Sequence, residues 1–173
     1  MQKMKEFQRS EKQYLSTGVN QNSATGNPTL HGEIVAISNC TSILTYPNGP
    51  YKLSPSEASS AWADPTLYTK AESCPMCASA IRWAGSKEYL YGTSIERLIE
   101  TGSGQIDIAS SEVFMQSWDM GTNTKYSPEM LTNKADPFFL WQFSRSIFLQ
   151  RLATGIREEV ARDLDDVHSS AAE

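Results

Sequence analysis

Apolar and polar positions along the chain follow two different periods, which predicts helices interleaved with short strands. Runs of four to six apolar-rich residues bounded by Pro, Gly or Asn predict strands, and a helical period is clearest after Asp136, where Trp141, Phe148 and Ile156 share one side. Strands are expected at 14–19, 66–69 and 87–91, and helices are expected to begin near residues 29, 54, 74, 93, 110 and 136. Alternating strands and helices favour an α/β layer fold.

Several helix boundaries are marked by capping residues. Ser54-Pro55-Ser56-Glu57 has the spacing of a capping box with proline in the first turn, and Thr29 is a reasonable N-cap for the helix before it. Cys74-Pro75 begins a third helix that Gly85 ends, and it is expected to carry Ile81 and Trp83 towards a core. The strand at 66–69 is expected to be buried, and 126–135 is expected to be a loop.

Composition narrows the classes of function. The 173 residues carry a net charge of -5 and contain no basic block, so nucleic acid is an unlikely partner. No apolar run approaches 18 residues, and the polar start lacks the apolar segment of a signal peptide, which together favour a cytoplasmic protein without a membrane span. We expect one domain at 14–165 between polar tails at 1–13 and 166–173.

Two short motifs, His31-Gly32-Glu33 and Cys74-Pro75-Met76-Cys77, carry the candidate chemistry. They offer one imidazole and two thiolates, and three protein ligands with an open fourth position are typical of a catalytic zinc. A closed structural zinc would need a fourth ligand. The remaining cysteine, Cys40, lies two to three helical turns from His31, which is too far unless the helix breaks. The remaining alternative is that both cysteines are ordinary buried thiols and Glu33 is an ordinary helix glutamate.

Both motifs fall at predicted helix starts, where the helix dipole stabilises the thiolate form that binds metal. Glu33 follows His31 by two residues, so it can face the cavity without being a ligand. A zinc ion lowers the pKa of water to about 7, and a nearby carboxylate could then take its proton and pass it to a leaving group.

The motifs and their surroundings resemble the cytidine deaminase superfamily, in the cytidine and deoxycytidylate deaminase-like branch that includes guanine deaminases and tRNA adenosine deaminases. The resemblance runs from about Gly18 to about Ile108. It is carried by Gly18-Val19-Asn20, Asn27-Pro28-Thr29-Leu30-His31-Gly32-Glu33, Leu67-Tyr68-Thr69, Glu72-Ser73-Cys74-Pro75-Met76-Cys77 and Ala80-Ile81-Arg82-Trp83-Ala84. The last stretch is more similar to guanine deaminases than to the tRNA enzymes.

The resemblance implies a three-layer α/β/α sandwich with a mixed sheet, here apparently lacking the family's first helix and strand. It also implies Zn²⁺ on His31, Cys74 and Cys77, with Glu33 as the proton shuttle of a hydrolytic deamination. The substrate would be a small base, nucleoside or nucleotide contacted by Asn20, with Gly32 and Trp83 as further substrate-binding residues. The family often forms homodimers.

Two departures from the family pattern bear on activity. Ser73 stands where the family has proline before the first zinc cysteine, and Gly32 replaces an alanine, leaving its backbone N–H available. The front of the chain is short, which keeps open a rival interpretation: a zinc-stabilised, deaminase-like binding module that is weakly active or inactive.

Overall fold

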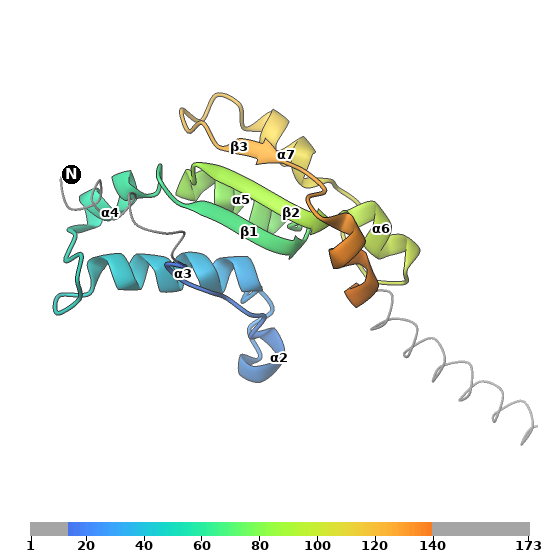
Figure 1. Ribbon diagram of the computed structural model, residues 1–173, viewed down its shortest axis with the longest axis horizontal. Helices are drawn as coiled ribbons and strands as arrows, with labels where there is room; N and C mark the ends of the chain where they lie inside the picture. The colour runs from blue at the N-terminus through green and yellow to red at the C-terminus, as the bar shows by residue number, and fades with distance from the viewer. Residues whose placement is uncertain (1–13, 140–173) are drawn as a thin grey trace, which may run out of the picture.

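Three parallel strands form the sheet in the part of the chain that the structure, a computed structural model, describes, which is residues 14–139. They are β1 (Thr66–Ala71), β2 (Glu88–Thr93) and β3 (Lys125–Ser127), in the spatial order β1-β2-β3 (Figure 1). Both strand pairs are parallel, so crossover helices are needed between them. The α/β class is confirmed, and the described sheet is parallel, where a mixed one was expected.

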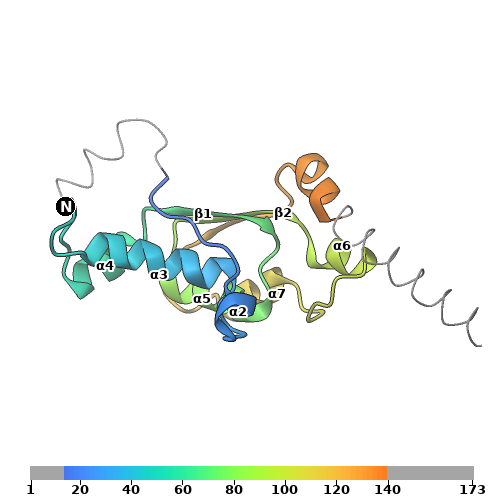
Figure 2. The ribbon, with the colours of Figure 1, turned by 90° about the horizontal axis from the view of Figure 1, so that it is seen from below.

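Helices flank the sheet unequally. Helices α3 (Gly32–Thr45), α5 (Pro75–Ala84) and α7 (Ser110–Gln116) lie on one side of it, as Figure 2 shows. On the other side, a helix over 132–139 reaches the sheet: a Cβ added to Gly92 would lie 2.5 Å from the Cβ of Ala135, and Lys70 Nζ lies 4.4 Å from the centre of the Phe138 ring. The expected layers on both faces are therefore present, the second only at one end of the described sheet.

The core has two parts. One lies between α3 and α4 (Pro55–Ala61), where Leu44, Ala58 and Trp62 are buried together. The other lies under the sheet, where Tyr89 and Tyr91 of β2 pack with Ile81 of α5. The smaller helices α2 (Asn22–Thr25) and α6 (Ile95–Glu100) lie outside both clusters. The second cluster holds α5 against the sheet through Ile81, and the first turn of the same helix carries Cys77.

Two strand predictions are corrected. Residues 14–19 form no strand: the segment runs beside α3, where Ser16 Oγ donates to the carbonyl of Ala36 at 3.0 Å and Asn39 Nδ2 donates to the carbonyl of Thr17 at 2.9 Å. The strand β1 is also not buried. It forms one edge of the described sheet, its residues alternate between exposed and half-buried, and Tyr68 is 51% exposed.

Some helix boundaries are confirmed and others are shifted, including one that a candidate cap, Thr29, had marked. The Ser54 capping box with Glu57 is present, and Gly85 ends α5 in the left-handed conformation with φ 73°. Helix α3 begins at Gly32 instead of near Thr29, because the backbone at 27–31 is held in turns. Helix α6 is capped by Ser94 instead of Thr93. The helix expected from Asp136 begins at 132, inside the segment expected to be a loop.

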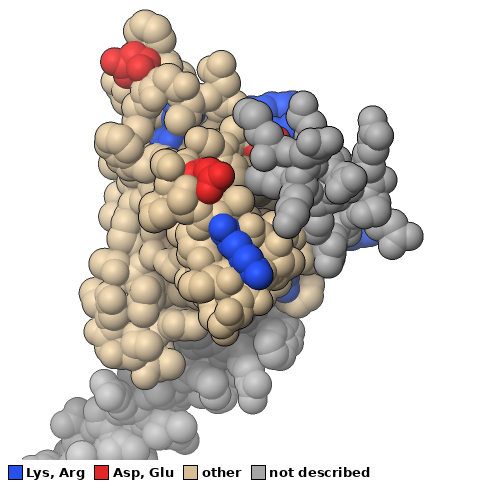
Figure 3. Space-filling model, turned by 90° about the vertical axis from the view of Figure 1, so that its left-hand side faces the viewer, with Lys and Arg blue, Asp and Glu red and all other residues tan. Residues whose placement is uncertain are grey.

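Some expectations concern residues outside the described range. The tails at 1–13 and 166–173, the domain limit at 165 and the apolar side that includes Trp141 all lie there. Within the part that is described, no helix is both long and apolar enough to cross a bilayer. On the face drawn in Figure 3, Lys, Arg, Asp and Glu side chains are scattered among uncharged residues and form no continuous basic patch.

Gly18 sets how closely the N-terminal segment approaches α3. A Cβ added there would lie 2.0 Å from the carbonyl oxygen of Gly32 and 2.4 Å from the backbone nitrogen of Ala36. Because both atoms belong to a helix backbone, they cannot move aside cheaply. We expect Gly18→Ala to lower Tm by about 5–10 °C, an unfolding penalty of about 2–3 kcal/mol, measured by thermal unfolding.

Gly104→Ala is the matched control, since a Cβ there meets nothing within 4 Å. It should leave Tm unchanged within about 2 °C. Equal Tm values for the two variants would show that the 14–20 segment does not lie against α3.

Candidate metal centre

The first motif stands at the beginning of α3. His31 is the residue immediately before the helix, with extended backbone angles (φ -72°, ψ 161°), and Glu33 lies in the first turn. A glutamate in the first turn suits the positive end of the helix dipole. His31 and Glu33 are both half-buried, so each can reach a cavity at the helix end.

The second motif begins α5 in the same way. Cys74 immediately precedes the helix with φ -60° and ψ 164°, Pro75 is its first residue, and Cys77 is in the first turn. Proline is favoured at the first position of a helix, because a backbone N–H there, which proline lacks, would have no helical partner. Cys77 is fully buried and Cys74 half-buried, so both sulfurs are carried by one helix turn at the edge of the core.

The two helix ends bring His31, Cys74 and Cys77 together, as the sequence predicted. Cys74 Sγ lies 3.6 Å from His31 Nδ1, and the three possible ligand atoms all lie within 4.8 Å of one another. Ligand atoms around a tetrahedral zinc with bonds of 2.0–2.3 Å are separated by about 3.5 Å, so this donor set fits the ion. Within residues 14–139 it is the one such group of His, Cys, Asp or Glu.

Cys40 is not part of this group. It is buried between α3 and α4 with Leu44 and Trp62, and burial raises the pKa of its thiol. The closed four-ligand arrangement considered for Cys40 therefore has no support in the described structure.

The two cysteines of the group differ electrostatically. A hydrogen bond from Cys77 lowers the pKa of Cys74 to about 5, with a smaller contribution from the nearby His31. The same hydrogen bond, burial and the negative charge of Glu33 raise the pKa of Cys77. These opposite shifts favour the thiolate at Cys74, and thiolate is the form of cysteine that binds a divalent metal.

Glu33 is held by Ser73, which the sequence marked only as a departure from the proline of the family pattern. Ser73 Oγ donates to Glu33 Oε1 at 2.7 Å, and the backbone N–H of Ser73 donates to the hydroxyl of Tyr89 at 2.8 Å. Ser73 does not cap α5, because Cys74 occupies that position. The pattern held no signal for this contact, since 40 residues separate its partners.

Asn20 and Gly32 are brought together, although not in the predicted way. Asn20 Oδ1 accepts from the backbone N–H of Gly32 at 2.7 Å. The N–H expected to be available for substrate is therefore bonded to Asn20, which satisfies one of the free donors at the start of α3. The Asn20 side chain is exposed, and its amide Nδ2 is the part that could face a ligand.

Trp83 is not brought to the centre. It lies nine residues after Cys74 along α5, about 13 Å at the helical rise, and its side chain is 77% exposed. The expectation that it points into the core is wrong, and its role as a substrate-binding residue stays a prediction that this position does not favour.

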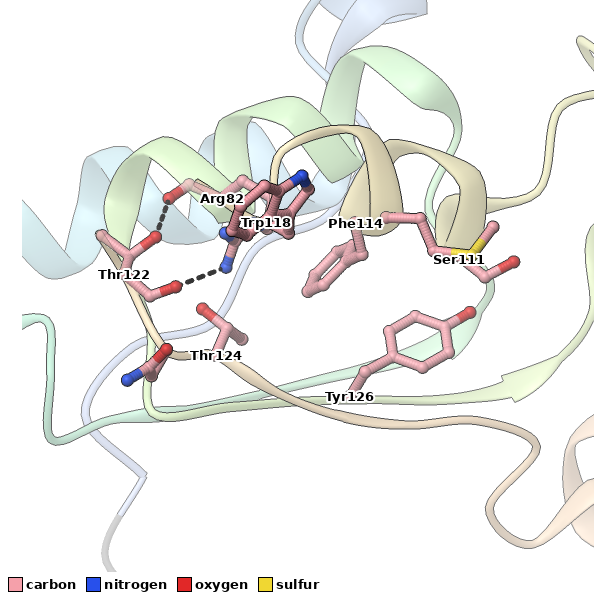
Figure 4. A pocket seen from close by; sticks show the side chains of 9 residues that line it. Arg82, Ser111, Phe114, Trp118, Thr122, Thr124 and Tyr126 are labelled. Atoms are coloured by element: carbon pink, nitrogen blue, oxygen red, sulfur yellow. Dashed lines mark hydrogen bonds between the residues drawn. The ribbon is translucent and has the colours of Figure 1, made fainter. Parts of the chain in front are cut away.

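A hollow of about 360 Å³ lies between α5, α7 and β3 (Figure 4). Its lining residues include neither His31 nor the two cysteines. Arg82, one of its lining residues, donates to Ser117 Oγ at 2.8 Å and to the carbonyl of Thr122 at 2.8 Å. The hollow is thus organised by an arginine that ties α5 to the segment after α7.

Glu72, which belongs to the family pattern but had no predicted role of its own, fixes the strand end next to the cysteines. It is buried, its Oε2 accepts from the N–H of Ile95 at 2.8 Å, and its Oε1 accepts from the N–H and hydroxyl of Ser110 at 2.7 Å each. One carboxylate therefore satisfies donors at the starts of both α6 and α7.

Comparison with known proteins points to the part of the chain that contains the metal centre. The family model for the cytidine and deoxycytidylate deaminase zinc-binding region matches residues 7–93, half of the chain. Guanine deaminase of Bacillus subtilis (strain 168) is 33% identical over 88 residues, which are 51% of this chain and 48% of that protein. The chain thus spans about half the length of this relative.

Solved structures show the same fold. A variant of NE0047 in complex with 8-azaguanine has a TM-score of 0.53 at 17% identity, covering 75% of this chain and 64% of that one. A second NE0047 variant with the same ligand has a TM-score of 0.52 at 18% identity, covering 73% and 63%. Together with the family match and the His31, Cys74 and Cys77 cluster, this shows that the chain belongs to the family of the cytidine and deoxycytidylate deaminase zinc-binding region.

Proposed function

We propose that this chain is a zinc-dependent hydrolase that deaminates a small nucleobase, nucleoside or nucleotide. The observation that carries the proposal is the convergence of His31, Cys74 and Cys77 from two helix ends, with Glu33 held beside them by Ser73. Three ligands would hold a zinc ion and leave one position open, and a carboxylate beside that open position has no purpose in a purely structural site.

His31, Cys74 and Cys77 would hold a zinc ion, which when bound would supply the Lewis acidity that lowers the pKa of water to about 7. Glu33 takes a proton from the attacking water and delivers it to the ring nitrogen, then assists the departure of ammonia. The amino carbon of the substrate gains an oxygen and loses its nitrogen, so one water is consumed for each ammonia released. Asn20 orients the ring through its amide group.

An amino-purine is the first substrate class to test. The Bacillus subtilis relative is a guanine deaminase, and NE0047 was crystallised with 8-azaguanine, a purine analogue. The net charge of -5 also favours a small ligand over a polynucleotide. A homodimer and a cytoplasmic location stay predictions.

The test combines metal content with ammonia release. Purified chain should hold about one zinc per molecule and release ammonia from at least one member of a panel of guanine, adenine, cytosine and their nucleosides and nucleotides. One zinc per chain without ammonia release would favour the binding-module interpretation. Absence of both would refute the metal centre.

Asn20 accepts a hydrogen bond from the backbone of α3, so a test of its role in substrate binding must separate that role from the structural contact. Asn20→Asp retains an acceptor for the N–H of Gly32 and removes the Nδ2 donor, whereas Asn20→Ala removes both. We expect both variants to lower turnover by about 10- to 100-fold, because a buried polar contact to substrate is worth roughly 1–3 kcal/mol. Steady-state kinetics on the best substrate of the panel measures this.

Stability separates the two variants. Asn20→Asp should keep the Tm of the wild type, and Asn20→Ala should lower it, by an amount corresponding to about 1 kcal/mol. Full turnover by Asn20→Asp would restrict Asn20 to its contact with α3.

A further inference from the structure

Ser73 makes two contacts that the proline of the family pattern cannot make. Its hydroxyl donates to Glu33 Oε1 at 2.7 Å, and its backbone N–H donates to the Tyr89 hydroxyl at 2.8 Å. Proline has neither a hydroxyl nor an N–H. Ser73 is 0% exposed, so water does not compete for either bond. The departure from the family pattern therefore adds a polar link between the sheet and the carboxylate.

Tyr89, which accepts the hydrogen bond from the Ser73 backbone, is held rigidly in the core. Tyr89 is fully buried in β2 and stacks on Phe114 with ring centres 5.7 Å apart and planes at 21°. Burial raises the pKa of Tyr89 to about 12, so its hydroxyl stays protonated at neutral pH. Tyr89 fixes the backbone of Ser73, and the backbone of Ser73 fixes where its hydroxyl stands.

The carboxylate that accepts the Ser73 hydrogen bond belongs to Glu33, the proton-transfer group of the proposed function. A hydroxyl bonded to a carboxylate oxygen restricts the rotation of that carboxylate and occupies one of its two oxygens. We propose that Ser73 is a positioning residue for the deamination: it holds Oε1 of Glu33, so that Oε2 faces the attacking water and carries the proton to the substrate. This inference rests on the proposed function.

The first measurement is steady-state kinetics of the zinc-loaded full chain with guanine as the probe. Ser73→Ala should lower kcat about tenfold with KM nearly unchanged, the ratio expected for one charge-assisted hydrogen bond made to the reacting group. Zinc content should stay at one per chain. Ser73→Thr, which retains the hydroxyl, should restore most of kcat.

Ser79→Ala is the matched control. It removes a hydroxyl that donates to the carbonyl of Pro75 within α5, away from Glu33, and should leave kcat unchanged. An equal loss of kcat in Ser79→Ala, or loss of zinc by Ser73→Ala, would each overturn the positioning role.

The second measurement does not depend on activity. In a double-mutant cycle, Ser73→Ala should lower the unfolding midpoint of the wild type clearly more than that of Glu33→Ala, because the hydroxyl loses its partner only once. Equal shifts in both backgrounds would overturn the contact. A wild type that deaminates nothing would overturn the proposed function and the catalytic meaning of Ser73 with it, while the cycle would still report whether the contact exists.

Discussion

Glu33→Gln should retain about one zinc per chain and lose deamination by a factor of about 10²–10⁴, the range typical of general acid–base catalysis. Glutamine keeps the shape of the side chain and can still accept the hydrogen bond from Ser73 Oγ, but it cannot take a proton from water. Since one carboxylate serves both proton transfers, the loss should fall near the upper end. Ammonia release and metal analysis of the same preparations measure the two quantities.

Glu57→Gln is a matched control for this substitution. Glu57 stands in the first turn of α4, as Glu33 does in α3, and its carboxylate completes the Ser54 capping box on the surface. The Glu57→Gln substitution should change the free energy of unfolding slightly and leave kcat unchanged. If Glu33→Gln sheds its zinc, the glutamate is a ligand and the open-site arrangement is wrong.

The sequence was sufficient for several local features that caps and short motifs encode, although the candidate cap Thr29 did not mark the start of α3. Pro75 and the Ser54 capping box mark their helix starts, Gly85 marks a helix end, and the two motifs at the starts of α3 and α5 identified the three possible ligands. Each of these signals depends on backbone groups within a few residues, so it can be read from spacing alone.

Contacts between distant residues were not predictable in this way. Nothing in the apolar pattern at 14–19 tells that Gly18 will lie against the α3 backbone, which turns an expected strand into a segment beside a helix. The same holds for Ser73 and Glu33, which are 40 residues apart, and for Glu72, which joins two helix starts. Such pairings follow from tertiary packing, which a single sequence does not display.

Trp83 shows the limit of periodicity within one helix. It was expected to point into the core with Ile81, yet two residues along a helix are about 200° apart, and the side chain of Trp83 is exposed while that of Ile81 is buried. Two other large apolar side chains are exposed nearby in the sequence: Met115 in α7 and Trp118 just after it. A tryptophan in a family-like stretch was thus a weak indication of a pocket wall.

Cys74→Ser should abolish stoichiometric zinc binding and lower Tm. A serine hydroxyl stays protonated at neutral pH and is a poor ligand, whereas the pKa of the Cys74 thiol is lowered to about 5. Because metal binding at a site formed only in the folded state contributes to folding, the stabilisation by zinc should disappear as well. At zinc concentrations 100 times Kd that stabilisation is about 2.7 kcal/mol, or about 5–10 °C for a domain of this size.

The decisive comparison is thermal unfolding with zinc and with a chelator. Wild type should melt at clearly different temperatures in the two conditions, and Cys74→Ser should melt at the same temperature in both. Cys40→Ala is the control: Cys40 is buried in the cluster between α3 and α4, so its loss should lower Tm in both conditions and leave the zinc-dependent difference intact. If Cys40→Ala removed the zinc-dependent difference and Cys74→Ser kept it, the ligands would have to be reassigned, because the two helix ends would not be what holds the ion.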